Sequence, residues 1–312
     1  MSAFKFIACS DLHIKKTAPK ARKDLYFSSI RRKLIWLFKL AHENDACIVC
    51  GGDVFDNVSV PHSVIEELIR LALEYKVKLL TVYGQHDLRY HVYSSYKNTP
   101  LAILLAAIDG YHLDEKPFIN DFVAIQGASW ERDIPAPVND KVNILATHRM
   151  VTEGGPLWPG HIGFDTPDSL GKTGFDIVVS GDNHKSFISI DKNGTYVINS
   201  GSLVRSTVSQ ITHTPRVVLC TVTDAHVITT EWIEVPIREA HLVFKNEEIE
   251  KHNDKLFETK IQLQSFTKQL NEYKIEKPDY MHNLIIFKKT VTDAYIIAAL
   301  ERIITKVQST KV

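Results

Sequence analysis

The sequence contains few cysteines, no long apolar run and no excess of charge of either sign. Of its four cysteines, Cys47 and Cys50 form a C-x-x-C pair within a short apolar run. On a strand, residues three positions apart point to opposite faces, and the chain holds no second pair of this kind. The cysteines are therefore expected to be buried free thiols, and zinc or disulfide chemistry is disfavoured.

The balanced charge limits how the chain could bind a polyanion, and the lack of a long apolar run indicates where in the cell the protein is found. Lys plus Arg and Asp plus Glu both number 37, so a polyanion such as DNA would have to be held by local patches. No apolar run approaches the roughly 18 residues of a membrane span, and residues 1–9 are too few for a signal peptide. We therefore expect a cytoplasmic protein with no membrane partner, from a bacterium or from a virus that infects one.

A glycine-rich strand end is the central feature that the sequence does contain. The apolar run 46–50 leads into Gly51, Gly52 and Asp53. A buried strand that ends in two glycines delivers a carboxylate to the rim of a sheet, with no bulky side chain beside it. Other runs that read as strands end in metal-binding types of residue, at 11–13, 84–87, 147–148 and 181–184. Ligands bind at this edge of open α/β sheets, so we expect these side chains to meet there, with Asp53 bridging two metal ions.

The order of the elements predicts an α/β fold. In the first part of the chain, apolar residues at helical spacing in 24–44 and 61–72 alternate with strands. Further strands are expected between residues 122 and 235, separated by Gly, Pro and Asp. A chain of 312 residues with 44% hydrophobic content can hold one large domain and a smaller one. We expect two sheets packed face to face, with helices outside.

Two metal-binding types of residue follow the first predicted strand, at residues 4–9. Asp11 and His13 are two positions apart, so on an extended chain both would point to the same side and could bind one ion. The basic segment 15–23, which includes Lys15 and Lys16, leaves the same end of the strand. A phosphate-binding loop and a solvated loop are both open for this segment.

Together, the strand-end residues resemble the signature of the calcineurin-like metallophosphoesterases. The matching blocks are D-x-H at Asp11 and His13, G-D-x-x-D at 52–56, G-N-H-[DE] at 84–87, the lone His148, and G-H-x-H at 181–184. Within this superfamily the chain is more similar to the SbcD-like double-strand-break repair nucleases, through segments 126–130 and 199–206. The resemblance covers residues 1–235 and implies a four-layer αββα sandwich of two mixed sheets. A small α+β capping or partner-binding region would follow at 236–312.

The resemblance also implies two divalent metal ions. It assigns Asp11, His13 and His184 to one ion, Gln85, His148 and Asp182 to the other, and Asp53 to both. Gln85 replaces the family's Asn, and Asp182 replaces the first His of G-H-x-H. Both changes fall on the second ion's ligands, which become richer in oxygen and more negative because Asp replaces His, and this favours manganese, or magnesium, over zinc. A degenerate second site remains the alternative.

Catalytic roles follow from the same resemblance. Two cations would generate a nucleophile from water and neutralise the phosphoryl oxygens. His86 resembles the family's general acid, and Asp87 would orient its ring. Basic side chains beside these blocks are candidates for contacts to DNA phosphates, with simple solvation as the alternative for each: Lys15, Lys16, Arg89, Arg149, Lys185 and Arg205.

The composition changes after residue 236, where the chain becomes highly charged. Apolar residues recur there every seven positions, at Ile249, Leu256, Leu263 and Leu270. This spacing predicts one long amphipathic helix, followed by a strand at 284–287 and a helix that begins at Thr292. In SbcD-like nucleases such a region caps the site or binds the coiled coil of an SbcC-like ATPase. Packing of both helices on the phosphoesterase domain is the other interpretation.

We therefore expect a metal-dependent DNA nuclease that acts as an exonuclease on duplex ends and as an endonuclease on single-stranded or hairpin DNA. It would work in DNA repair, recombination or phage DNA metabolism with an SbcC-like SMC-type ATPase. A homodimer is expected from the resemblance alone. Two alternatives stay open: a phosphatase or phosphodiesterase for small or protein substrates, and a DNA-binding scaffold with an impaired metal site.

Overall fold

In a computed structural model, the described residues are 2–157, 161–272, 284–285, 287–289, 291 and 294–309. The chain forms two compact units. One comprises Met1–Glu153 and Asp165–Lys245, and the other comprises Gly154–Phe164 and Asn246–Val312. The division into domains after residue 235 remains a prediction, because compactness alone does not show which part can fold independently.

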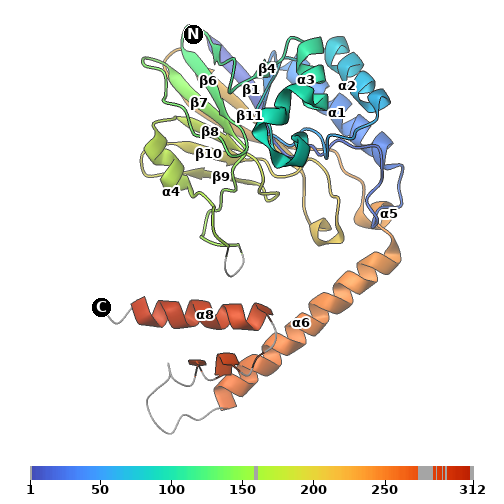
Figure 1. The fold of residues 1–312 in the computed structure, drawn as a ribbon, viewed down its shortest axis with the longest axis vertical. Coiled ribbons are helices and arrows are strands. Elements are labelled where there is room, and N and C mark those ends of the chain that lie inside the picture. Colours follow the sequence, from blue (N-terminus) through green and yellow to red (C-terminus); the bar gives the residue numbers. More distant parts are fainter. Residues whose placement is uncertain are drawn as a thin grey trace. The chain divides into compact units, whose positions relative to one another are not determined.

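The first unit contains two mixed six-stranded sheets (Figure 1). The first sheet has the order β12-β11-β1-β2-β3-β4, with β1 at Ala3–Cys9, β2 at Cys47–Cys50, β3 at Leu79–Thr81, β4 at Tyr111–His112, β11 at Arg216–Thr223 and β12 at Ile228–Glu234. The second has the order β5-β6-β7-β8-β10-β9, with β5 at Phe118–Ile119, β6 at Val123–Ala128, β7 at Val142–Thr147, β8 at Ile177–Ser180, β9 at Phe187–Ile190 and β10 at Tyr196–Asn199. Strands β1 to β4 are parallel, as are β6, β7, β8 and β10.

Alternate residues of the strands face two different cores. In β1, Phe6 and Ala8 pack between the two sheets, whereas Ile7 and Cys9 pack beneath the helices. Helices α1 (Tyr26–Glu43), α2 (His62–Glu74) and α3 (Pro100–Ala107) together cover this outer face of the first sheet (Figure 1). On the outer face of the second sheet, Leu170 of the short helix α4 (Pro167–Leu170) packs against Val178 and Val197. The predicted αββα sandwich is confirmed, with a thin fourth layer.

The alternation also decides the environment of the cysteines. Cys47 packs between the sheets and Cys50 packs under the helices, so the two thiols lie on opposite faces of β2. All four cysteines are buried and free, as predicted. Within the described residues, no helix is both long enough and apolar enough to cross a lipid bilayer.

Beyond residue 245 the second unit is helical at every described residue except Val291. Helix α6 spans Asn246–Glu272 and α8 spans Ala294–Ser309, which confirms the predicted long helix. The strand predicted at 284–287 is wrong, because residues 284–285 and 287–289 are helical and the buried Leu284 packs with Leu300. The predicted cap Thr292 lies outside the described residues, as do the side chains of Leu263 and Leu270.

Candidate metal centre

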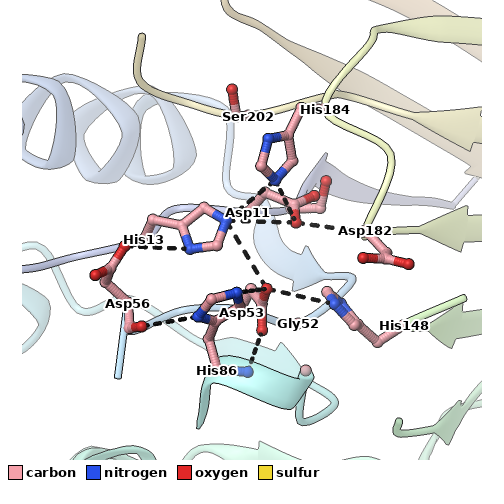
Figure 2. A network of polar contacts seen from close by, with 12 residues as sticks. Asp11, His13, Gly52, Asp53, Asp56, His86, His148, Asp182, His184 and Ser202 are labelled. Carbon is pink, nitrogen blue, oxygen red and sulfur yellow. Dashed lines mark hydrogen bonds and ion pairs between the residues drawn. The ribbon is translucent and has the colours of Figure 1, made fainter. Parts of the chain in front are cut away.

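Residues from both sheets meet at the carboxyl ends of the parallel strands (Figure 2). The first sheet contributes Asp11 and His13 after β1, Asp53 after β2, and the short 3₁₀ helix Gln85–Asp87 after β3. The second sheet contributes His148 after β7, and Asp182 and His184 after β8. Every residue predicted to bind a metal therefore lies at one common edge, although the first and last are 173 positions apart in the printed sequence.

The first group of candidate ligands joins β1 to the loop after β8. The Nε2 atoms of His13 and His184 are 3.2 Å apart. The Oδ1 atom of Asp11 lies 3.8 Å from the first of these nitrogens and 3.6 Å from the second. Burial lowers the pKa of His13 against the opposing effect of the Asp53 and Asp11 carboxylates. His13 is thus held in the neutral form, which is the form that binds metals.

Asp53 lies at the middle of the cluster. Its Oδ1 accepts a hydrogen bond from the backbone N–H of His86 at 3.0 Å. Its Oδ2 is buried and has no hydrogen-bond partner among the described residues, but lies 3.5 Å from His148 Nε2 and 3.8 Å from His13 Nε2. Burial would raise the pKa of Asp53, but the positive charge and hydrogen-bonding capacity of His148 outweigh it and hold the pKa well below its usual range. An ionised, buried and unpaired oxygen is costly unless a cation binds it.

His148 is oriented by the backbone that carries Asp53. Its Nδ1–H donates to the carbonyl oxygen of Gly51 at 2.6 Å, which leaves Nε2 directed at the cluster. That Nε2 is buried and without a hydrogen-bond partner in the described part of the chain. Burial would lower the pKa of His148, but the Asp53 carboxylate outweighs it and raises the pKa to about 10. A metal ion at Nε2 would therefore have to displace a proton.

Unusual backbone conformations place these side chains. Asp11, His13, Asp53 and Asp182 have φ angles of 51°, 43°, 51° and 68°, which are left-handed and rare for residues other than glycine. The extended geometry that the sequence suggested for Asp11 and His13 is therefore wrong, although both side chains do reach the site. Gly84 is required for a different reason, since an added Cβ would come within 2.0 Å of Asp53 Oδ1.

The two residues that depart from the family pattern, Gln85 and Asp182, contact each other directly. Gln85 Nε2 donates to Asp182 Oδ1 at 3.0 Å, so its amide oxygen points the other way. That Oε1 is buried and has no hydrogen-bond partner in the described structure. The backbone N–H of Asp182 also donates to Asp11 Oδ1 at 3.2 Å. The replacements thus orient each other and leave the Gln85 oxygen free for a cation.

His86 and Asp87 are placed differently from each other. The Nδ1–H of His86 donates to the carbonyl oxygen of Asp56 at 2.9 Å, and its Nε2 lies 4.0 Å from Asp53 Oδ2. The expectation that Asp87 orients this ring is wrong. Its carboxylate instead accepts hydrogen bonds from the backbone N–H groups of Val54, Phe55 and Gly84. Asp87 therefore fixes the loop that carries Asp53, and burial together with the charge of Asp53 raises its pKa to about 8.

The unpaired atoms fit divalent cations. Five buried polar atoms in the cluster lack hydrogen-bond partners within the described residues: Asp11 Oδ2, His13 Nδ1, Asp53 Oδ2, Gln85 Oε1 and His148 Nε2. Carboxylate, amide and imidazole donors suit manganese, magnesium and zinc. Cations bound there would activate water and neutralise the phosphoryl oxygens of a substrate. Three overlapping groups of residues could each hold an ion, and Asp53 belongs to two of them, one with His13 and His86 and one with Asp11 and His148.

The predicted DNA-contacting cations have unequal environments. Lys16, Arg89 and Lys185 are exposed. Lys15 is paired with Asp56 at 2.8 Å, and Arg149 with Asp165 at 3.4 Å. Arg205 is only 4% exposed, and it donates to the carbonyl oxygens of Ile211 and Arg238. The fold therefore encloses its guanidinium, so the exposed contact to DNA predicted for Arg205 is wrong.

A groove beside His184 was not predicted. We call it the hydroxyl groove; it has a volume of about 640 Å³, and its lining includes Lys185, Ser186, Ser206, Thr207, Ser209 and Arg216. None of the described residues that line it is acidic. The signal in the sequence is the run of hydroxyl residues at 206–214, which matches none of the metal-binding blocks of the family signature.

Comparisons with known proteins agree with this geometry. Residues 4–186 match the family described as Calcineurin-like phosphoesterase. A search of the curated proteins gave no significant match.

Solved structures with a similar fold include three bacterial proteins. TT1561 of Thermus thermophilus is 12% identical, with a TM-score of 0.46, and the alignment covers 75% of this chain and 100% of that one. A 5′-nucleotidase precursor from the same organism is 11% identical, with a TM-score of 0.41 and coverage of 75% and 55%. The Haemophilus influenzae NAD nucleotidase is 12% identical, with a TM-score of 0.42 and coverage of 79% and 52%. The chain thus spans about half the length of the latter two proteins.

Proposed function

This chain belongs to the calcineurin-like phosphoesterases, a family of metal-dependent hydrolases, and from that premise we propose that it is a DNA nuclease. It would cut phosphodiester bonds as an exonuclease on duplex ends and as an endonuclease on single-stranded or hairpin DNA. We place it in the bacterial cytoplasm, encoded by the host or by a phage. Its partner would be an SMC-type ATPase that resembles SbcC.

The observation that carries this proposal is the hydroxyl groove next to the metal centre. Its volume lies within the range of about 300–1,000 Å³ found for small-molecule sites, so size does not select the substrate. The lining supports a chain of phosphates, because it combines hydroxyl groups with the exposed Lys185 and has no acidic residue among the described ones. Arg216 also lines the groove, but it is paired with Glu234 at 3.1 Å. Such contacts position a nucleic-acid backbone without reading its sequence.

The chain's own residues have distinct parts in the proposed reaction. Asp11, Asp53 and His148 would hold the cations, and the hydroxyl groove would align the backbone beside them. His86 directs Nε2 at the cluster while Asp56 holds the other ring nitrogen. With Nδ1–H committed to this carbonyl, neutral His86 has a lone pair on Nε2, so it can donate a proton to the leaving oxygen only as an imidazolium.

Cleavage of end-labelled duplex and hairpin DNA tests the proposal. We expect cutting in manganese or magnesium, none in EDTA, and loss of cutting in Asp53→Asn. Hydrolysis of a model phosphodiester that DNA does not inhibit, with no DNA cutting, would assign the chain to small or protein substrates instead. DNA binding without turnover of either substrate in any metal would identify a scaffold with an impaired site.

Variants of the groove sharpen the choice of substrate. The double substitution Lys185→Ala and Thr207→Ala should raise the KM for DNA more than the KM for the model ester. The reason is that these side chains lie where additional phosphates would bind. Equal changes for both substrates would argue against a polymeric substrate.

Helix α6 supports the proposed partner. Leu256, Phe257 and Ile261 on this helix are 56%, 65% and 47% exposed. Exposed apolar side chains on one helix suit docking of a coiled coil or of a second copy of this chain. Size-exclusion chromatography of the full chain, with and without an SbcC-like coiled coil, separates three outcomes: a complex, a homodimer, and a monomer whose helices serve only the chain itself.

A further inference from the structure

A second cluster of charge lies in the first unit, outside the metal centre. We call it the cationic cavity; it has a volume of about 170 Å³ and is lined by residues that include Arg22, Arg32, Lys33, Trp36, Arg205 and Arg238. None of the described lining residues is acidic, and none is a candidate metal ligand. The cavity brings together α1, the segment after β10 and the segment after β12.

Three of these cations are buried. Arg22, Lys33 and Arg205 are 7%, 8% and 4% exposed. Arg22 forms a two-pronged ion pair with Asp24, with both distances 2.8 Å. Lys33 and Arg205 have carbonyl oxygens as acceptors, including that of Leu203 for Lys33 at 2.6 Å. Carbonyl oxygens satisfy hydrogen bonds but carry no net charge, so three buried cations face one carboxylate among the partners described.

The unbalanced charge has an electrostatic cost. Burial lowers the pKa of Lys33 to about 7, and the charges of Arg22 and Arg205 contribute to this shift. Burial and the charge of Arg22 also lower the pKa of Arg205. Apolar residues at such positions are often neutral or stabilising. A cluster of buried cations with this electrostatic cost is expected to bind a compensating anion.

We propose that the cationic cavity binds a phosphomonoester-type dianion, either free inorganic phosphate or the terminal phosphate of a nucleic acid. Three buried cations and one carboxylate leave an excess of between one and two positive charges at pH 7, because Lys33 is about half protonated there. A phosphate group carries about −1.5 to −2 at this pH. Arg22 and Arg205 each have five N–H donors, of which the described contacts use three and two, so donors remain on both for phosphate oxygens. At about 170 Å³ the cavity is smaller than the roughly 300 Å³ lower limit of small-molecule sites, which favours a phosphate group over a whole nucleotide.

Isothermal titration calorimetry of the full chain in EDTA tests this site without a contribution from the metal centre. Inorganic phosphate and sulfate are the probes, and Asp53→Asn is the second safeguard against binding at the metal centre. Lys33→Met should weaken anion binding by about tenfold or more, since a hydrogen bond to a charged group contributes about 1.5–3 kcal/mol. Lys39→Ala is the matched control, because Lys39 is an exposed lysine of the same helix outside the cavity.

A second variant covers the case in which Lys33→Met does not fold. Arg32 and Arg238 line the same cavity but are exposed, so Arg32→Ala with Arg238→Ala should leave folding intact. This double variant should weaken sulfate and phosphate binding several-fold, by analogy with the loss of charge-assisted hydrogen bonds. Wild-type affinity in a folded double variant would contradict the proposal.

The two sources of the anion are separated with 5′-phosphorylated and 5′-hydroxyl oligonucleotides. Tighter binding of the phosphorylated form, lost in Lys33→Met, would assign the cavity to nucleic-acid ends. Binding of free phosphate without that preference would assign it to the small ion, and either result supports the site. The proposal is overturned if metal-free wild type shows no saturable binding of phosphate or sulfate. It is also overturned if Asp53→Asn abolishes that binding while Lys33→Met leaves it unchanged.

Discussion

The metal centre and the cationic cavity are both buried clusters of one predominant charge, but they differ in how complete they are. At the metal centre, buried atoms such as Asp53 Oδ2 and His148 Nε2 have no hydrogen-bond partner within the described residues. In the cavity, Lys33 and Arg205 have carbonyl partners, and only their charge is unbalanced. The first site needs its ligand to satisfy its polar atoms, whereas the second is satisfied without one. We therefore expect a resident ion at the first and an exchangeable ion at the second.

Loss of the Asp53 carboxylate should have the largest effect. Asp53→Asn should reduce hydrolysis by about a thousandfold or more, because it removes several kcal/mol of charge stabilisation from cation binding. Asp109→Asn is the matched control: Asp109 has a left-handed φ of 48°, close to the 51° of Asp53, but its side chain is 91% exposed. Steady-state kinetics and metal analysis measure both variants. Retained activity in Asp53→Asn would show that hydrolysis does not depend on the metal centre, just as it is not expected to depend on the cavity.

The role of His86 comes next in size. His86→Ala should lower hydrolysis by about 10²- to 10⁴-fold, the range for loss of a general acid, and leave bound metal nearly unchanged. His91→Ala is the control, since His91 is an exposed neighbour whose ring lies 6.2 Å from that of His86. Loss of metal together with activity would identify His86 as a ligand, a possibility that its distance to Asp53 leaves open.

The tight packing around Asp53 predicts a stability effect. In Gly84→Ala, the added Cβ would meet the Asp53 carboxylate at 2.0 Å. We expect a loss of about 1–3 kcal/mol in the free energy of unfolding, typical of overpacking, together with weaker metal binding. At Gly154 an added Cβ meets nothing within 4 Å, so Gly154→Ala serves as the control. Urea denaturation with and without metal measures both effects, and equal stabilities would contradict the packing argument.

Metal binding at the metal centre should release protons, whereas anion binding in the cationic cavity should take them up. At pH 8 His148, with its pKa raised to about 10, carries a proton that a metal ion must displace, so metal binding should release about one proton. Lys33, with its pKa lowered to about 7, is largely neutral at this pH, so sulfate binding in the cavity should take one up. Calorimetry in buffers of different ionisation enthalpy measures both quantities. The same sign at both sites would overturn the comparison.

The smallest expected effect is the pH dependence of stability due to Lys33. Both folded and unfolded Lys33 are protonated below pH 7, so the burial penalty is complete there. Between pH 7 and the ordinary pKa of 10.5, only the unfolded state keeps the proton, and stability rises with pH.

Lys33→Met should therefore stabilise the chain relative to wild type at pH 6 by about 1 kcal/mol and lose this advantage toward pH 10. The charged or titratable groups facing Lys33 are Arg22, Arg205, Asp24 and His213, with Arg32 and Arg238 at the cavity lining. These groups are present in both the wild type and the Lys33→Met variant, so the difference in stability between the two proteins reports on Lys33 alone. A difference that does not change with pH would contradict the assignment.

Sequence analysis located the metal centre because its signals are local. Asp53 follows an apolar run and two glycines, and His148 directly follows a strand, so each could be assigned from its neighbours in the chain. The backbone conformation of Asp11 and His13 could not be assigned in this way, because their left-handed φ angles are imposed by hydrogen bonds to the loop of Asp53. Both side chains do lie in the cluster, but the extended geometry from which they were predicted is incorrect.

Features that depend on distant contacts were missed. Arg205 adjoins a conspicuous segment in the sequence, but its guanidinium lies over the ring of Phe244 and is enclosed. The cationic cavity unites positions 22–36, 205 and 236–243, which share no local pattern. The short apolar run at 284–287 was ambiguous between strand and helix, and packing of Leu284 on Leu300 decided it.

The position of β1 has a consequence for how the protein is made. Its neighbours in the first sheet are β2 and β11, and Ala3 pairs with Thr223. While the ribosome is still synthesising the middle of the chain, β1 has one open edge, and Asp11 and His13 lack His184. A nascent fragment therefore cannot assemble the first group of ligands, and its exposed strand is a target for chaperones or for aggregation. The first group of ligands can form once His184 has been made, which is before strands β9 to β12 are made.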